Sequence, residues 1–221
     1  MKLEAFTEAI TQALGARLAA LMLYGSAARN SETAARASMN TLLVVTGDAI
    51  DADVFAQLSG PVRSWVASGH PPPIIMTERE WLDASDAFPI EYDDIRAAHR
   101  VLAGNRDPWR GITVRAVDVR RQLEQELMGK LVHLRQAYAA NWNRPKRLVD
   151  VIHETRAGFF TMLRAVLRLA GRTPPAEPDA LVREAGGLIG FGADGLTEPA
   201  AYLDAMTRAA EFVNRMERTV S

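Results

Sequence analysis

The sequence predicts an α/β (α+β) domain, a mixed sheet with flanking helices, followed by an all-α helical bundle. Before residue 110, short apolar runs closed by turn-forming residues alternate with amphipathic helical segments, which is typical of a sheet covered by helices. After residue 113, apolar residues recur every three or four positions over long stretches, which is typical of packed helices. Residues 105–113 contain Pro and Gly without periodicity, so the predicted domains are residues 1–110 and 111–221.

The composition excludes several classes of protein. The chain has 221 residues, a formal net charge of −1 and no cysteine, which rules out disulfides, thiolate zinc sites and cysteine nucleophiles. Near-neutral charge argues against non-specific binding of the whole molecule to nucleic acid or to membranes. The N-terminal residues carry two glutamates and no unbroken apolar core, and no run reaches the roughly 18 apolar residues of a membrane span. We therefore expect a cytoplasmic protein with neither a membrane nor nucleic acid as its partner.

Three apolar runs in the first half are short enough to be buried strands. They are Leu21–Tyr24, Leu42–Val45 and Ile74–Met76. Gly25-Ser26 closes the first run and Thr46–Asp48 closes the second. Because both flanks are turn formers, we expect strands rather than segments of longer helices.

Two amphipathic helices are expected beside these strands. The first covers residues 2–14, where apolar side chains recur at helical spacing. The second covers residues 51–68 and contains Gly60-Pro61, which favours a break or kink because proline lacks the backbone N–H that a helix uses. Helices of this kind normally cover one face of a sheet.

Residues 77–104 complete the predicted sheet domain. Thr77 is expected to cap a short helix running towards Ala87, with Glu80 completing a capping box. Apolar and acidic residues alternate over Ile90–Ile95, which predicts a strand at the edge of a site, and a further short strand follows over 99–104.

The turn after the first strand has the features of a phosphate-binding turn. Gly25 lets the backbone approach a ligand closely, and Ser26 is placed as the N-cap of a short helix that contains Ala27, Ala28 and Arg29. The leading N–H groups of such a helix attract anions, and Arg29 adds a guanidinium fork. An ordinary turn with a helix cap explains the same residues, so this pattern alone leaves both interpretations open.

The last 111 residues are expected to form a bundle of four helices. The apolar stripes cover 114–141, 144–169, 179–188 and 198–220. Gly190-Phe191-Gly192 has the spacing of part of a dinucleotide fingerprint, but no strand precedes it, so we interpret it as a turn.

Over a longer stretch, the sequence resembles the nucleotidyltransferase (DNA polymerase β-like) superfamily. The resemblance rests on Tyr24–Arg29, a loop, and the strand Leu42–Val45. In that family a Gly-Ser turn cradles a nucleoside triphosphate, and two carboxylates one residue apart on the next strand hold Mg²⁺. The resemblance therefore implies a nucleotidyltransferase-like fold in which Gly25, Ser26 and Arg29 bind the nucleotide. The family commonly follows its catalytic domain with a helical bundle, as the order of elements here predicts.

The chain departs from the family at the metal site. The two carboxylate positions fall on Met39 and Thr41, with Asn40 between them. Mg²⁺ prefers hard oxygen ligands, above all carboxylates, and a thioether with a neutral hydroxyl does not replace them. Without a metal clamp, phosphoryl transfer loses its main source of charge stabilisation.

The family's third carboxylate lies on a later strand. Glu91 or Asp94 matches this position, and we favour Glu91 as the remaining acidic ligand or base. The segment Met76–Gly104 is also similar to a bacterial subgroup of the family. A solvated strand edge explains the same acidic residues equally well.

Two functions remain open. The first is transfer of a nucleoside monophosphate from a triphosphate to an acceptor, with Mg²⁺ as cofactor. The second is a catalytically inactive relative, a nucleotide sensor or a protein-interaction scaffold that needs no cofactor. A nucleoside triphosphate, a second copy of the chain and another protein are the candidate partners.

Other charged and titratable residues are expected to be structural. The four histidines show no metal-ligand spacing, and His133 lies beside the apolar stripe of its helix. Basic residues gather near the start of each long helix: Arg115, Arg120, Arg121, Arg144, Lys146 and Arg147. A solvated helix face is the favoured interpretation, and the lining of a cleft between the domains, where a nucleotide or an RNA end would enter, is the alternative.

Overall fold

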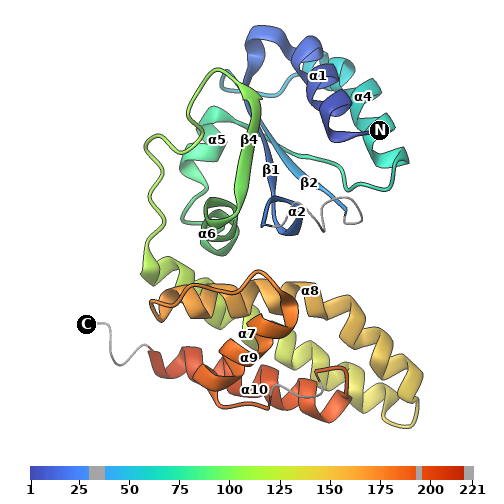
Figure 1. Ribbon diagram of the computed structural model, residues 1–221, viewed down its shortest axis with the longest axis vertical. Helices are drawn as coiled ribbons and strands as arrows, with labels where there is room; N and C mark the ends of the chain where they lie inside the picture. Colours follow the sequence, from blue (N-terminus) through green and yellow to red (C-terminus); the bar gives the residue numbers. More distant parts are fainter. Residues whose placement is uncertain (30–37, 193–195, 217–221) are drawn as a thin grey trace. The chain divides into compact units, whose positions relative to one another are not determined.

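The computed structural model describes residues 1–29, 38–192 and 196–216, which form two compact units (Figure 1). The sheet unit comprises Met1–Phe88 and Ile95–Thr113. The helical unit comprises Pro89–Asp94 and Val114–Ser221. The protein is therefore of the α+β class with a separate helical part. Among the described residues, no helix is long and apolar enough to cross a membrane.

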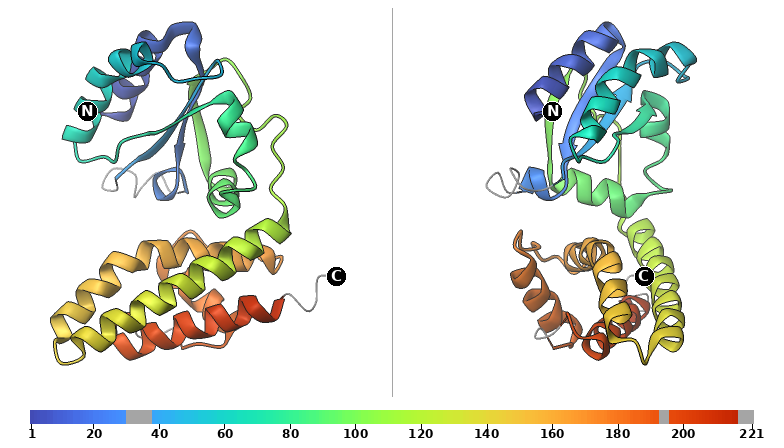
Figure 2. Two further views of the ribbon diagram at one scale, coloured as in Figure 1. Left: turned by 180° about the vertical axis from the view of Figure 1, so that it is seen from behind. Right: turned by 90° about the vertical axis from the view of Figure 1, so that its right-hand side faces the viewer.

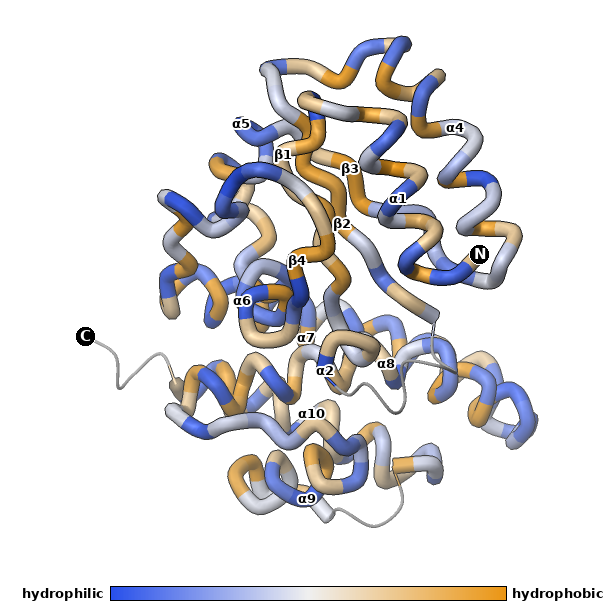
Figure 3. Tube along the Cα trace, turned by 45° about the horizontal axis from the view of Figure 1, so that its top comes forward, coloured by the Kyte–Doolittle hydropathy of each residue, from blue (hydrophilic) through white to orange (hydrophobic). Residues whose placement is uncertain are grey.

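The sheet unit is built on a mixed sheet of four strands in the order β3-β2-β1-β4. Central strand β1 (Leu18–Tyr24) pairs antiparallel with β2 (Asn40–Val45) and with β4 (His99–Gly104). Strand β3 (Ile74–Thr77) pairs parallel with β2. β1 and β2 are apolar along most of their length, as Figure 3 shows, and this agrees with the predicted buried strands.

Two helices cover one face of this sheet. Helix α1 (Leu3–Leu14) leads through the 3₁₀ turn η1 (Gly15–Arg17) into β1, and α4 (Ala52–Ala67) lies beside α1 (Figure 1). Their shared core centres on Phe6 and Trp65, whose rings stack at 4.3 Å between centroids. The other members of this core alternate along β1 and β2, as a one-sided sheet requires: Leu21, Leu23, Leu43 and Val45.

Several expectations about the sheet unit need correction. Helix α4 continues without a break past Pro61, and Asp51 caps its N-terminus by accepting a hydrogen bond from the N–H of Val54 at 2.9 Å. The strand β3 is less buried than predicted, with Ile74 41% exposed, because β3 is at the edge of the sheet. The helix after it, α5 (Glu78–Asp83), ends well before Ala87.

The predicted strand over Ile90–Ile95 is wrong, because these residues lie in helix α6 (Pro89–Ala97). Pro89 occupies the first helical position, where its fixed φ favours a helix and its missing N–H costs nothing. The short alternation of apolar and acidic residues is compatible with the period of a strand and with that of a helix, and Pro89 favours the helix.

Gly104 fixes the end of β4. It has φ +118°, and a Cβ there would lie 2.3 Å from the carbonyl oxygen of Ala19. That carbonyl accepts the N–H groups of Asn105 and Arg106, at 3.1 and 3.2 Å. The loop that follows β4 is thus held tightly against the start of β1.

Four long helices make up the helical unit, as the apolar stripes predict (Figure 2). They are α7 (Ala116–Asn141), α8 (Pro145–Leu169), α9 (Pro178–Ile189) and α10 (Pro199–Met216). Three of them begin with proline, the residue most compatible with a first helical position. Gly190 ends α9 in the left-handed conformation, so the interpretation of Gly190-Phe191-Gly192 as a turn is confirmed.

One continuous cluster of mainly apolar side chains forms the core of the helical unit. Phe159 and Tyr202 meet edge to face, with ring centroids 5.5 Å apart. The Tyr202 hydroxyl lies 3.0 Å from Thr155 Oγ1, so its polar end is hydrogen-bonded. Burial raises the pKa of Tyr202, which keeps this residue neutral.

Candidate functional site

The glycine turn predicted to bind phosphate is present at the end of β1. Gly25 is buried with φ +80°, and a Cβ at this position would lie 3.3 Å from Asn40 Nδ2. Its N–H donates to the carbonyl of Ala98 at 3.2 Å, which ties the turn to the residue before β4. The positive φ favours glycine here, and the Asn40 amide would have to shift slightly to make room for a Cβ.

The short helix α2 (Ser26–Arg29) follows this turn directly. The carbonyl of Gly25 accepts the N–H groups of Ala28 and Arg29, each at 3.1 Å, so Gly25 and not Ser26 is the N-cap. The predicted N-cap, Ser26, is therefore wrong by one residue. Ser26 is the first helical residue and is exposed, while Arg29 is half-buried at the end of the helix.

The positions of the family's carboxylate pair are part of the core. Thr41 is 1% exposed and pairs with Leu23 across the β1–β2 ladder, on the face covered by α1 and α4. Met39 is packed against the same core, and its N–H donates to His70 Nδ1 at 3.3 Å. Among the described residues, Thr41 Oγ1 has no hydrogen-bond partner. These two positions support packing on the helix-covered face.

His70 is a structural residue of this core. Its ring stacks on Trp65 at 4.0 Å between centroids, and its Nδ1 accepts the backbone N–H of Met39. Burial, reinforced by the nearby N-terminal ammonium, lowers the pKa of His70. The neutral imidazole is therefore favoured, as an acceptor of this hydrogen bond must be.

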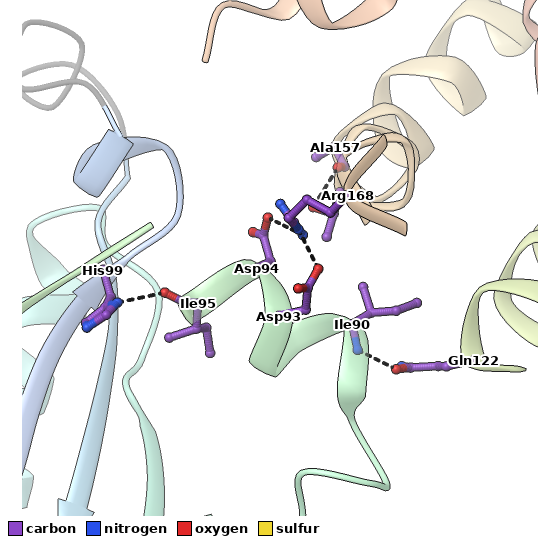
Figure 4. Close-up of polar contacts among 9 residues, drawn as sticks. Ile90, Asp93, Asp94, Ile95, His99, Gln122, Ala157 and Arg168 are labelled. Carbon is purple, nitrogen blue, oxygen red and sulfur yellow. Dashed lines mark hydrogen bonds and ion pairs between the residues drawn. The ribbon is translucent and has the colours of Figure 1, made fainter. Parts of the chain in front are cut away.

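The third predicted carboxylate is on a helix and not on a strand, which corrects the expected placement of both Glu91 and Asp94. Both residues are on α6 and belong to the helical unit. Figure 4 shows Asp94 on this helix. Glu91 is exposed and accepts a hydrogen bond from Gln122 Nε2 at 3.0 Å. The Gln122 Oε1 accepts the N–H of Ile90 at 2.8 Å, so one amide side chain of α7 fixes the start of α6.

Asp94 is engaged in an ion pair. Arg168 of α8 donates from Nε to Asp93 Oδ2 at 2.5 Å and from Nη2 to Asp94 Oδ1 at 3.5 Å (Figure 4). Asp94 is only 8% exposed. The guanidinium therefore compensates the charge of two neighbouring carboxylates inside the helical unit, which is a structural role.

A polar and aromatic cluster that the sequence did not reveal occupies the start of β4. His99 Nε2 accepts from Trp109 Nε1 at 2.9 Å, and its Nδ1 lies 3.0 Å from the carbonyl of Ile95. These contacts assign the proton to Nδ1, which donates to that carbonyl. Trp109 also meets Trp81 edge to face at 5.4 Å between centroids. His99 is thus a structural histidine, as expected, and Trp109 carried no sequence signal beyond its size.

The remaining predicted residues are on the surface of the helical unit. His133 and His153 are exposed, so His133 does not join the apolar stripe beside it. Ion pairs hold part of the basic group: Arg115 Nε lies 2.6 Å from Asp118 Oδ2, and Arg120 Nη1 lies 2.9 Å from Glu124 Oε2. Arg121, Arg144, Lys146 and Arg147 are exposed. The exposed members agree with a solvated helix face, whereas the side chain of Arg120 is only 12% exposed and does not.

No family model matches the chain, and no curated protein is significantly similar to it.

Proposed function

We propose that this chain is a nucleotide-binding protein with a nucleotidyltransferase-like sheet that does not transfer a nucleotidyl group. One observation carries the proposal: the glycine turn is present, whereas at the carboxylate positions Thr41 is buried and Met39 is half-buried against the same core. The glycine turn is the feature that nucleotide binding uses, whereas nucleotidyl transfer needs in addition a carboxylate pair that can hold a metal.

The binding half of the proposal rests on the end of β1. The positive φ of Gly25 directs the chain from the strand into α2, and Ser26 presents its hydroxyl to solvent at the first helical position. The leading N–H groups of a helix have no partners within it, so they can donate to phosphate oxygens. Because α2 has a single turn, these N–H groups and the hydroxyl contribute more than the helix dipole does.

Loss of transfer chemistry follows from the burial of Thr41. A carboxylate pair on one strand binds a metal only if both side chains reach a solvent-accessible site. Thr41 is 1% exposed on the face that α1 and α4 cover, and Met39 packs against the same core. The acidic residues Glu91 and Asp94 are hydrogen-bonded or ion-paired within the helical unit. Nucleotide sensing therefore suits these residues better than catalysis.

Calorimetric titration of the full chain with ATP and with GTP, each with and without Mg²⁺, tests the proposal. We expect binding whose affinity is the same in both conditions, because no carboxylate pair links the metal to the protein. Binding that requires Mg²⁺, or release of pyrophosphate from a triphosphate, would establish the enzymatic alternative. Absence of binding would leave the protein-interaction scaffold.

The site is tested with Ser26→Glu. A carboxylate at this exposed first helical position repels phosphate, so we expect loss of at least about tenfold in affinity. The matched control is Ser59→Glu, an exposed position within α4 of the same unit. Equal loss in both variants would show that net charge rather than the Gly25 turn governs binding.

A further inference from the structure

The sheet unit contains a second candidate site, a pocket of about 480 Å³ at the other end of β1. It opens beside Ala20, whereas the glycine turn follows Tyr24, and the intervening strand separates them by roughly 17 Å. Its volume is within the range of small-molecule sites. The two candidate sites are therefore at opposite ends of β1.

Apolar side chains make up part of the lining of this pocket. Ala20 and Val44 contribute from the sheet face opposite α1 and α4, and Trp81 and Leu82 contribute from α5. Ile112 also lines the pocket. Leu82 is 45% exposed, so its side chain is accessible to the apolar part of a ligand.

The pocket is held in shape by hydrogen bonds on both sides. Trp81 Nε1 donates to the carbonyl of Pro108 at 2.6 Å, which joins α5 to the loop after β4. At the start of that loop, Gly104 allows the contact with Ala19 described above. A ligand consequently enters a preformed site and orders little of the chain, which favours binding of small molecules.

The charged side chains that line the pocket differ in whether they have a partner of opposite charge. Arg106 Nη1 pairs with Glu78 Oε1 at 3.2 Å, and Asp107 Oδ1 accepts the N–H of Trp109 at 2.9 Å. Arg110 also lines the pocket, is exposed, and has no ion pair within the described part of the chain. One guanidinium thus remains to receive an anion beside an apolar wall.

We propose that this pocket binds a small amphipathic carboxylate, an aromatic or branched aliphatic acid with one negative charge. The apolar part packs against Trp81 and Leu82, and the carboxylate pairs with Arg110, whose planar fork matches a carboxylate. A nucleoside triphosphate suits the pocket less well, because the positive charges of Arg106 and Arg110 are offset by the carboxylates of Glu78 and Asp107 in the same lining. The pocket is therefore a site for a different class of ligand from the one proposed at Gly25.

Titration with 4-phenylbutyrate and with its uncharged amide, 4-phenylbutyramide, tests this proposal. Binding is measured by calorimetry and by quenching of tryptophan fluorescence, since Trp81 lines the pocket and Trp109 contacts the Trp81 ring. We expect the acid to bind about tenfold more tightly than the amide, because only the acid pairs with Arg110. Saturating ATP should leave this affinity unchanged.

Two variants and one control locate the ligand. Arg110→Gln should weaken binding of the acid about tenfold and leave binding of the amide unchanged. Leu82→Glu places a carboxylate at the exposed mouth and should weaken the acid further. Arg63→Gln, an exposed arginine on α4, is the control and should have no effect.

Failure of 4-phenylbutyrate to bind the wild-type chain would overturn the proposal. Equal affinity of the acid for wild type and Arg110→Gln would also overturn it. Because Arg110 and Leu82 are exposed or partly exposed, both variants should keep the wild-type thermal midpoint, which distinguishes loss of a site from loss of the fold. Competition by ATP would place the acid at the glycine turn and refute a second site.

Discussion

The two units differ in the polar side chains that they bury. Among the described residues, the buried polar side chains of the sheet unit are the hydroxyls Thr41 and Thr77. Those of the helical unit are the charged groups Asp94, Asp118 and Arg164. The resemblance to nucleotidyltransferases implies charged ligands on the sheet, yet the buried charges are in the helical unit.

The difference between the units reflects the different cost of burying a hydroxyl and of burying a charge. A buried hydroxyl without a partner costs little enough to be tolerated, whereas a buried charge requires a counter-charge. Arg115 pairs with Asp118, and Arg168 pairs with Asp94, so two buried carboxylates of the helical unit have such partners. Mutations should therefore lower the free energy of unfolding most where a buried ion pair is broken. They should lower it least where a buried hydroxyl without a hydrogen-bond partner is replaced.

The largest effect is expected for Arg168→Met. This change removes the guanidinium from Asp93 and Asp94, and we expect the free energy of unfolding to fall by about 3 kcal/mol. The matched control is Arg208→Met, which breaks an exposed pair with Asp204 on α10 and should cost less than about 1 kcal/mol.

Urea unfolding followed by circular dichroism measures both changes. Adding Asp93→Asn and Asp94→Asn to Arg168→Met should recover part of the loss, because no charge is then left without its counter-ion. Similar losses in Arg168→Met and Arg208→Met would show that partial burial of the first pair has no energetic consequence.

A smaller loss is expected in the sheet unit for Thr77→Ala. The Thr77 Oγ1 accepts the N–H of Glu80 at 3.0 Å, and Glu80 Oε2 accepts the N–H of Thr77 at 2.8 Å. Removing this capping box should lower the free energy of unfolding by about 1.5 kcal/mol. Thr11→Ala, at an exposed position within α1, should change it by less than about 0.5 kcal/mol. A loss below that of Thr11→Ala would refute the role of the box.

Replacing the other buried hydroxyl should act in the opposite direction. Thr41→Val keeps the shape of the side chain and removes an Oγ1 that has no partner among the described residues, so we expect a gain of about 1 kcal/mol. Thermal and urea unfolding measure the change. A loss of stability would mean that this hydroxyl binds a group of the chain or a ligand.

The features that the sequence predicted correctly depend on near neighbours. The capping box joins Thr77 to Glu80, Gly190 ends its own helix, and the apolar stripes of α7 and α8 each repeat within one element. The features that it missed depend on distant pairs. Arg168 and Asp94 are separated by 74 residues, and no local pattern indicates that they meet.

The candidate site shows the same division. Gly25, Ser26 and Arg29 lie close together because all three belong to the same short turn and helix, although Gly25 and not Ser26 is the N-cap. Glu91 was assigned to a strand on the basis of an alternation too short to distinguish a strand from a helix, and Pro89 favoured the helix. The burial of Met39 and Thr41 depends on α1 and α4, which the strand itself does not encode.

The smallest effect is expected from titration of His70, the histidine of the sheet unit that burial affects. Its pKa is lowered in the folded state, so below its ordinary value of 6.5 the unfolded chain binds more protons than the folded chain. Stability should therefore fall as the pH decreases from 6.5 towards the folded pKa, and the contribution should be constant above 6.5. His70→Gln removes the titration but keeps an acceptor for the N–H of Met39, so the urea midpoint of this variant should depend less on pH between 5.5 and 6.5. His153→Gln, at an exposed position in the helical unit, should keep the wild-type dependence. If the urea midpoints of His70→Gln and wild type depended on pH in the same way, the His70 ring would protonate as readily in the folded chain as in the unfolded chain. That result would contradict a neutral His70 that accepts the N–H of Met39.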